Sequence, residues 1–324
     1  MKTSLSGKWL LVAGAYALVM GAAWAQGSPG KPITFVVPFT AGSGTDIVAR
    51  LVAETMQRNM GQTIVVENRP GAGGSIASAQ VARAEADGHT VLIPSSSHAV
   101  NPAVYPNLPY DTLRDFVGVT ALAALPNVML TAPGKGYKTV ADVVAAAKAK
   151  PGQLNYASAG IGSATHLNAE KFRLQAGIEA THVPYRGTPE ALADVMGERV
   201  DWFFSPLSSA LPLIREGKVV PLAVSTATRH AALPNVPTTV EAGVPGSDFV
   251  FWVGMVVSAK TPPAQIERLH AEASKALADP AVVERLGRQG AVAYPLSTAD
   301  FNQFIRTEMD AAARIARAAN LKPQ

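Results

Sequence analysis

The sequence of 324 residues contains no cysteine. Disulfide bonds, thiol catalysis and cysteine-based metal sites are therefore excluded, and packing must supply the stability of the fold. Charged residues make up only 16% of the chain, with no block of like charge, and the formal net charge is +4. Such a mild charge argues against a nucleic-acid partner. No His, Asp and Glu set has metal-site spacing, so we expect neither a metal nor another cofactor.

The chain has one long hydrophobic run, which lies at its start. Lys2 and Lys8 precede an apolar run of about a dozen residues, which is too short to span a membrane, and the small-x-small sequence Ala23-Trp24-Ala25 follows. This pattern predicts a secretory signal peptide over residues 1–25, cut after Ala25. Gln26 would begin the mature chain, and because it is not cysteine, a lipid-anchored form is not expected.

The most informative stretch is Ile33–Asp46, where apolar and β-branched residues lead into a loop of small residues. An apolar periodicity opens at Ile47, which indicates a strand, a tight loop and a helix. Amides and hydroxyls at a helix N-terminus are a ready site for an anion. A well-capped turn, with Ser43 or Thr45 as N-cap, would explain this stretch alone. The same arrangement recurs at Leu154–His166, which favours a binding role.

Strands and helices alternate along the chain, which predicts an α/β fold with parallel sheets and ligands at the carboxyl ends of the strands. We expect the chain to cross to a second domain near residues 125–132 and to return through the Pro/Gly-rich residues 235–246. The middle domain is then an insertion, and two connecting segments suit a hinge that closes on a ligand. Lobe 1 would comprise residues 26–126 and 249–324, and lobe 2 residues 127–248.

Regular elements are expected throughout both predicted lobes. Strands are predicted at 33–37, 63–66, 90–94, 117–124, 127–131, 154–157, 180–184, 201–204, 219–225, 249–257 and 291–294. A helix is predicted from Ile47 to a C-cap at Gly61, and others at 75–84, 139–150, 165–175, 189–196, 211–216, 262–277, 280–288 and 299–319. Residues 95–98, three serines and a histidine, are expected to leave the third strand as a loop.

Two alternatives for the loop after residue 157 are weighed against anion binding. The first alternative is a dinucleotide-binding loop. The sequence contains G-x-G but lacks the third glycine of that motif, which argues against a dinucleotide site. Neither Ser158 nor Ser163 lies in G-x-S-x-G, yet a secreted hydrolase using one of them as nucleophile stays open. The loop's amides and hydroxyls can bind a carboxylate without a cation, which is the interpretation we favour.

Side chains at the same sheet edge could contact the rest of a ligand. His98 follows a strand, and Arg186, on a strand-to-helix turn, could bind an acidic group by two hydrogen bonds. Asp46 lies in a first helical turn, where a carboxylate stabilises the helix dipole whatever its function. His166 is better explained as a packed or capping residue, and His182 as a core residue.

Several motifs spread over the mature chain form a specific combination. They are Pro38-Phe39 with Gly42 and Asp46, Glu67–Gly74, Tyr156–Leu167, Val183–Gly187, Leu222–Val224 with Arg229, Leu233-Pro234, Val236–Thr238, Glu241–Gly243, Trp252 with Gly254, and Pro262. With these motifs the chain resembles the Bug-type solute receptors, the periplasmic substrate-binding proteins of tripartite tricarboxylate transporters.

The resemblance implies a two-lobed type II periplasmic binding protein fold without enzyme activity, which closes on a small carboxylate ligand and delivers it to membrane transporter subunits. It implies a carboxylate held between Phe39–Asp46 and Ser158–Thr165. In this chain Ala41 and Ser43 stand where the family commonly has Pro and Gly, which adds a hydroxyl. The expected ligand contacts are Phe39, Thr40, Ala41, Gly42, Ser43, Gly44, Asp46, Ser97, His98, Ser158, Ala159, Gly160, Gly162, Ser163, Thr165, Tyr185, Arg186 and Phe204.

The predicted function is therefore that of a periplasmic receptor for an organic acid, either a di- or tricarboxylate or an aromatic carboxylate. One alternative is the secreted serine hydrolase, and another is a ligand-dependent partner of a membrane sensor or regulator. We expect a monomer, because hinge motion needs free lobes.

Overall fold

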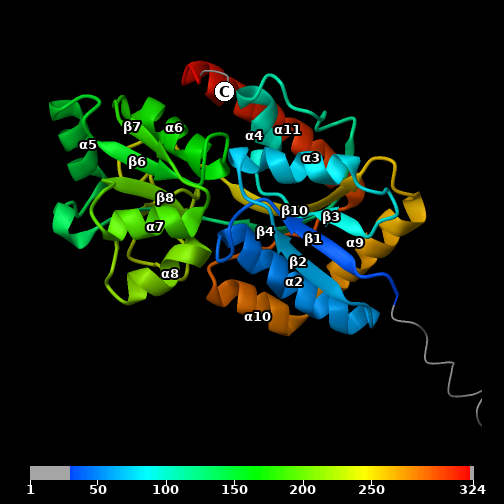
Figure 1. The fold of residues 1–324 in the computed structure, drawn as a ribbon. Helices are drawn as coiled ribbons and strands as arrows, with labels where there is room; N and C mark the ends of the chain where they lie inside the picture. Colours follow the sequence, from blue (N-terminus) through cyan, green and yellow to red (C-terminus); the bar gives the residue numbers. More distant parts are fainter. Residues whose placement is uncertain (1–29, 322–324) are drawn as a thin grey trace, which may run out of the picture.

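The computed structural model describes residues 30–321, so the predicted signal peptide lies outside the described residues. The chain folds around two β-sheets, which Figure 1 shows side by side. The six-stranded sheet has the order β11-β4-β10-β3-β1-β2 and the five-stranded sheet the order β7-β6-β8-β5-β9. We call the first sheet with its helices lobe 1 and the second lobe 2. The predicted two-lobed α/β fold is confirmed.

The strands of each sheet come from the parts of the chain that the alternation predicts. Lobe 1 contains β1 (Ile33–Val37), β2 (Ile64–Asn68), β3 (Thr90–Leu92), β4 (Phe116–Leu125), β10 (Phe251–Ser258) and β11 (Val292–Ala293). Lobe 2 contains β5 (Asn127–Thr131), β6 (Asn155–Ser158), β7 (Thr181–Pro184), β8 (Trp202–Pro206) and β9 (Val220–Val224).

The helices cover both sheets. In lobe 1 they are α2 (Gly44–Met60), α3 (Ser75–Arg83), α4 (Ser97–Val104), α9 (Pro263–Ala278), α10 (Pro280–Arg288) and α11 (Thr298–Ala318), with a short 3₁₀ turn η1 (Ala72–Gly74). In lobe 2 they are α5 (Val140–Ala149), α6 (Ala164–Ala176), α7 (Thr188–Met196) and α8 (Leu207–Arg215), with η2 (Pro133–Lys135). In Figure 1, α11 runs along α4, and it also contacts α6 of lobe 2.

Both sheets are mixed, so the prediction of parallel sheets holds for only part of each. Strands β1, β2 and β3 are parallel, but β10 is antiparallel to β3 and β4, and β5 is antiparallel to β8 and β9. Each of these two strands is the first one after the chain crosses from the other lobe. The rule that alternation gives parallel strands holds for strand–helix–strand units within one sheet, and a crossing breaks such a unit.

Helix α4 was not predicted, because residues 95–98, with three serines, were expected to form a loop; Pro102 lies inside the helix. Bonds to β10 hold its start: the Ser96 amide donates to the Trp252 carbonyl at 3.0 Å, and the Trp252 amide donates to Ser96 Oγ at 2.9 Å. The helix also packs against α11. Tertiary contacts therefore decide the structure of this segment.

The two crossing segments are tied together at Ser225, which is fully buried. Its hydroxyl accepts from the Asn127 amide at 3.2 Å and donates to the Phe249 carbonyl at 2.9 Å. Its backbone amide donates to the Asn127 carbonyl at 2.8 Å, and its carbonyl accepts from the Phe249 amide at 2.7 Å. Both connections between the lobes thus lie side by side.

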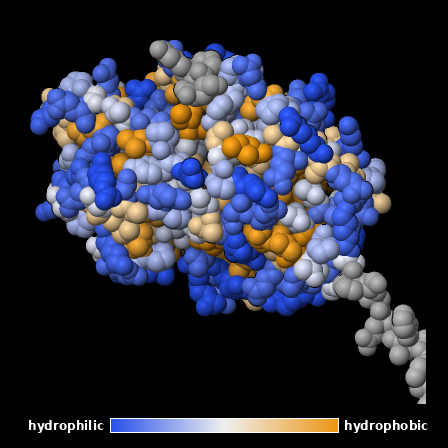
Figure 2. Space-filling model, in the orientation of Figure 1, coloured by the Kyte–Doolittle hydropathy of each residue, from blue (hydrophilic) through white to orange (hydrophobic). Residues whose placement is uncertain are grey.

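The core of lobe 1 extends to the second lobe, because Ala164 and Leu167 of α6 belong to its hydrophobic cluster. In lobe 2, Phe203 and Trp202 pack into different clusters on opposite faces of β8. Figure 2 shows mostly hydrophilic residues on the surface in view, with hydrophobic residues in small separate groups. Among residues 30–321, no helix has the length and hydrophobicity needed to cross a membrane.

Candidate functional site

Loop 1, residues 39–46, leaves β1 and starts helix α2. Ser43 is the N-cap, and its side chain accepts from the Asp46 amide at 3.4 Å. The Gly42 amide donates to Asp46 Oδ2 at 2.9 Å. Gly42 has φ of 81°, which favours glycine. The loop is therefore fixed by its own side chains, with the helix N-terminus turned toward the other lobe.

Loop 2, residues 158–165, leaves β6 and starts helix α6 in the same way. Ser163 is the N-cap, and its side chain accepts from the His166 amide at 3.2 Å. The Gly162 amide donates to His166 Nδ1 at 3.3 Å. The Thr165 hydroxyl accepts from the Ala159 amide at 2.9 Å, which ties the helix start back to the end of β6.

The two loops face each other across a cavity between the lobes. Its free volume is ≈ 10 Å³, which is room for about one water molecule. The first amides of α2 and α6 have no acceptor within their helices, so both helix N-termini offer donors and positive dipole ends to this space. The lining residues are Phe39, Ser43, Gly44, Thr45, Ala159, Ser163, Ala164, Thr165, Thr188, Pro206 and Phe251.

Hydrogen bonds between the lobes surround this cavity. The Thr40 hydroxyl donates to Glu190 Oε2 at 3.1 Å, and the Ser209 hydroxyl donates to the Gly42 carbonyl at 3.1 Å. On the other side, the Tyr105 hydroxyl donates to the Ile161 carbonyl at 2.7 Å. The lobes are closed on each other in this arrangement.

The structure brings part of each predicted segment to the cavity. Of the predicted contacts, Phe39, Ser43, Gly44, Ala159, Ser163 and Thr165 line it. Thr40 and Gly42 bond the other lobe beside it, and Ala41 is exposed. The Gly160 and Gly162 backbones, with φ of 112° and 74°, shape loop 2 without lining the cavity. The Asp46 carboxylate turns into lobe 1, where Arg50 and Asn68 donate to it.

The predicted distal contacts lie elsewhere. Ser97 and His98 are buried in α4, with the His98 ring against Phe116 at 5.0 Å between centroids. Phe204 is buried in the core of lobe 2. The Tyr185 hydroxyl donates to Asp194 at 2.7 Å, and Arg186 is exposed.

Five lining residues were absent from the predicted set: Thr45, Ala164, Thr188, Pro206 and Phe251. Thr45 and Ala164 lie within the predicted loops, and Thr188 opens a predicted helix, so the helix-start pattern could have identified them. Pro206 and Phe251 carry no such signal, because their places depend on how the two sheets face each other.

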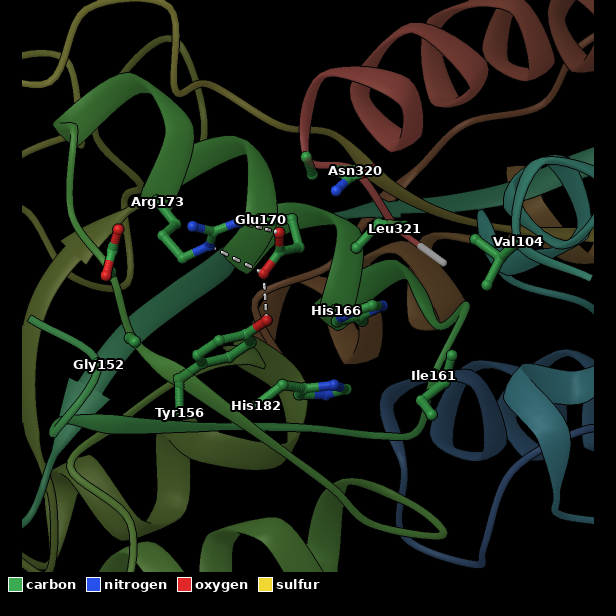
Figure 3. Close-up of a pocket in the computed structure, with 13 residues that line it drawn as sticks. Val104, Gly152, Tyr156, Ile161, His166, Glu170, Arg173, His182, Asn320 and Leu321 are labelled. Atoms are coloured by element: carbon green, nitrogen blue, oxygen red, sulfur yellow. Dashed lines mark hydrogen bonds and ion pairs between the residues drawn. The ribbon is translucent and has the colours of Figure 1, made fainter. Parts of the chain in front are cut away.

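A larger pocket of ≈ 440 Å³ lies behind loop 2, where Ile161 and His166 line it (Figure 3). His166 and His182 stack there with centroids 4.0 Å apart. Burial lowers the pKa of His166 to about 4 and that of His182 to about 3, so both rings are neutral near pH 7. His182 lines the pocket rather than the core, and its Nε2 lies 2.6 Å from Ser158 Oγ.

An ion pair occupies the far wall of this pocket. Arg173 donates to both oxygens of Glu170, at 3.1 and 2.8 Å, and the Tyr156 hydroxyl donates to the same carboxylate (Figure 3). The carboxylate and guanidinium thus satisfy each other. Within residues 30–321, no group of three or more His, Cys, Asp or Glu residues could hold a metal ion.

Relatives of known sequence support the resemblance. The chain is 41% identical over 263 residues to a UPF0065 protein of Pseudomonas sp. (strain P51), covering 81% of this chain and 78% of that protein. It is 34% identical over 296 residues to protein BugT of Bordetella pertussis, covering 91% of each.

Solved structures share the fold. Periplasmic binding protein BugD superposes with a TM-score of 0.88 at 30% identity, over 92% of this chain and 100% of that one. Rpa4515 of R. palustris, solved with adipate, gives 0.88 at 34% identity, over 92% and 100%. MatC of Rhodopseudomonas palustris, solved with bound malate, gives 0.84 at 32%, over 89% and 99%. These likenesses confirm the periplasmic binding protein fold.

The family match covers most of the chain. Residues 48–321 match the family described as the tripartite tricarboxylate transporter family receptor, TctC. Its members are solute-binding receptors and not enzymes. The chain therefore belongs to the TctC, or Bug, family of tripartite tricarboxylate transporter receptors.

Proposed function

We propose that this receptor is exported to the periplasm with cleavage after Ala25, binds a small organic acid through a carboxylate, and delivers it to the membrane subunits of its transporter. The carboxylate is held between loop 1 and loop 2. The lobes, residues 26–126 with 249–324 and residues 127–248, close on it about the two connections at Ser225. The receptor acts as a monomer.

One observation carries this proposal: two serine-capped helix N-termini face the same small cavity from opposite lobes. An anion placed there accepts hydrogen bonds from unpaired amides and interacts favourably with both dipoles. Removal from water strengthens these charge-assisted bonds. Because the cavity of this arrangement has room for about one water molecule, the ligand enters when the lobes separate, and they then close on it with a wider space between the two loops. Its affinity for that closed form shifts the equilibrium.

The chemistry of the relatives' ligands suits this site. Adipate and malate, found in Rpa4515 and MatC, are both dicarboxylates. We propose a dicarboxylate for this chain also, with its second carboxylate outside the two loops. Arg186 is our candidate for that end, because it is exposed and lies two residues before Thr188, which lines the cavity.

A thermal-shift and calorimetric screen of the mature chain tests this proposal. We expect adipate or malate to raise the melting temperature, since ligand at a hundred times Kd stabilises the folded state by about 2.7 kcal/mol. Adipamide is the matched control, because it keeps the length and loses both charges. Equal binding of the diamide, or no binding by any dicarboxylate, would contradict the carboxylate site.

A screen of monocarboxylates, tricarboxylates and aromatic acids should follow on the same protein. If dicarboxylates bind more tightly than monocarboxylates, Arg186→Gln should weaken binding of the dicarboxylate and leave binding of a monocarboxylate of similar length unaffected. Similar losses for both ligands would remove Arg186 from the distal site.

The serine hydrolase alternative is not supported. Ser158 and His182 do lie within hydrogen-bond distance, but the Ser158 hydroxyl also donates to the Gly160 carbonyl and accepts from its amide. An imidazole with a pKa of about 3 is a weak general base near pH 7. The family is also one of receptors, so we assign the Ser158–His182 pair to holding loop 2 in place.

A further inference from the structure

The peptide bond between Ile161 and Gly162 is held at both ends. Its carbonyl accepts from the Tyr105 hydroxyl at 2.7 Å, and its amide donates to His166 Nδ1 at 3.3 Å. A peptide group is planar, so fixing the oxygen and the hydrogen fixes its rotation. His166 belongs to the same lobe as this peptide, whereas Tyr105 belongs to lobe 1. This peptide thus gains one of its two restraints from the opposite lobe.

The backbones of the two lobes approach closely at this point. A Cβ atom on Gly73 of η1 would lie 2.3 Å from the Ile161 carbonyl oxygen. A Cβ atom on Gly162 would lie 2.8 Å from the Tyr105 ring and 3.0 Å from Asn101 Oδ1. Glycine at positions 73 and 162 therefore lets the lobes come close enough for the Tyr105 hydroxyl to donate to the Ile161 carbonyl.

Tyr105 is well placed to donate this bond. Its backbone amide donates to the Asn101 carbonyl at 2.9 Å, and it forms the C-cap of α4, which packs on α11. Burial raises the pKa of Tyr105 to about 12, so the hydroxyl keeps its proton. The donor is therefore carried by a helix packed into lobe 1.

From this geometry we propose that Tyr105 and Gly73 are positioning residues of the receptor. On closure they form a latch with the Ile161–Gly162 peptide, which stabilises the closed lobes and orders loop 2 next to Ser163. The latch rests on the proposed closure of the lobes, but it forms between protein atoms alone. It therefore acts on the free protein as well as on the complex.

This latch has a consequence for affinity. The apparent affinity of a ligand that needs the closed form scales with the population of that form. A single neutral hydrogen bond contributes about 0.5–1.5 kcal/mol, so Tyr105→Phe should lower the closed-to-open ratio by about two- to tenfold. Gly73→Ala should lower it further, because the new methyl group meets backbone rather than a flexible side chain.

Pulsed electron spin resonance distances between the lobes test the latch without any ligand. The absence of cysteine allows spin labels at two introduced positions, Asn59→Cys on α2 and Ala145→Cys on α5, both exposed. We would compare the labelled parent with Tyr105→Phe and Gly73→Ala. The matched control is Gly61→Ala, since Gly61 has φ of 61° against 59° for Gly73, but no atom lies within 4 Å of its added Cβ.

We expect both latch variants to lose short, closed-form distances, while Gly61→Ala keeps the parent's distribution. Unchanged distances in Tyr105→Phe and Gly73→Ala would overturn the latch, as would an equal change in Gly61→Ala. Because no acid is added, a failure here is distinct from a failure of the carboxylate screen.

Discussion

Loop 1 and loop 2 have the same backbone hydrogen bonds but different acceptor side chains. The serine amides donate to the Thr40 and Gly160 carbonyls at 3.2 and 3.0 Å, and the serine carbonyls accept from Ile47 and Leu167 at 3.0 and 3.1 Å. The third residue after each glycine-serine pair differs: it is Asp46 in loop 1 and His166 in loop 2. Both side chains accept from the glycine amide four residues earlier.

The difference shows that this loop needs an acceptor at that place, whether or not the acceptor is charged. A carboxylate near an anion site repels the ligand unless a cation compensates it, and Arg50 donates to both oxygens of Asp46 at 3.0 Å. His166 is uncharged and needs no cation. Loop 1 is therefore part of a charged network, whereas the matching turn of loop 2 is restrained by a neutral ring.

Removing the two acceptors should break this comparison most strongly. In Asp46→Ala, the Gly42 amide loses its acceptor, the Asn68 amide keeps only the Phe39 carbonyl, and half-exposed Arg50 loses its ion pair. We expect a loss of about 2–3 kcal/mol in the free energy of unfolding, because hydrogen bonds to a charged group are lost while Arg50 stays solvated. His166→Leu keeps most of the buried volume and should cost about 1–2 kcal/mol, because one neutral hydrogen bond is lost. Urea unfolding measures both, and equal losses would contradict the difference between the networks.

Acid should affect loop 2 through His166. The folded-state pKa is about 4, below the ordinary value of 6.5, so the unfolded chain binds more protons between these values. Stability is then fully present above pH 6.5 and falls toward pH 4, by on the order of 3 kcal/mol for this residue. His98 and His182 add to the decrease in the same direction.

Unfolding free energies between pH 7 and 4 check this prediction. In His166→Gln the decline should be shallower than in the parent, while Ser43→Ala, which removes no histidine, should run parallel to the parent. His182 is stacked on His166, and Arg173 lies in the same pocket, so both are kept unchanged in the comparison. If the unfolding free energy of His166→Gln fell with pH in parallel with that of the parent, protonation of the His166 ring would not be the cause of the decline.

The first helical residue also differs between the loops, being Gly44 in one and Ala164 in the other. A Cβ atom on Gly44 would lie 2.8 Å from Pro206 Cβ and 2.9 Å from Ser208 Oγ, both in lobe 2. Gly44→Ala should therefore oppose closure and weaken ligand binding about tenfold, with no loss of helix stability. Calorimetry measures the affinity, with Ala164→Gly as the matched control. If Gly44→Ala left the affinity unchanged, the lobes would have to be farther apart in the ligand-bound form than they are in this structure.

Most of the fold and both loops could be predicted from local sequence. Gly61 and Gly177 close their helices, and Ser43, Thr139 and Ser297 begin theirs, because caps depend on neighbouring residues. Helix α4 and the antiparallel strands could not be predicted in this way, because contacts between residues distant in sequence determine them. The hydrophobic and capping patterns within one lobe carry no information on how that lobe packs against the other.

The site shows the same limit. Loop residues such as Ser163 were predicted from a strand-to-helix pattern, while Phe251 and Pro206 reach the cavity only through the packing of two sheets. His98 was expected at the sheet edge, but its ring faces Phe116 because the unexpected helix turns it inward. The role of Tyr105 also depends on how the lobes meet, which no local pattern contains.

Removing the serine caps should give the smallest effects and separate capping from ligand binding. Ser43→Ala and Ser163→Ala should each cost about 1 kcal/mol in the free energy of unfolding. Ser163→Ala should cost slightly more, because its hydroxyl also bonds Thr165 at 3.1 Å. Ser297→Ala is the control, since Ser297 caps α11 away from the cavity with a comparable bond of 3.1 Å to the Asp300 amide. All three should lower the urea midpoint, but only the first two should weaken carboxylate binding in calorimetry; equal weakening by Ser297→Ala would mean that the caps act through overall stability.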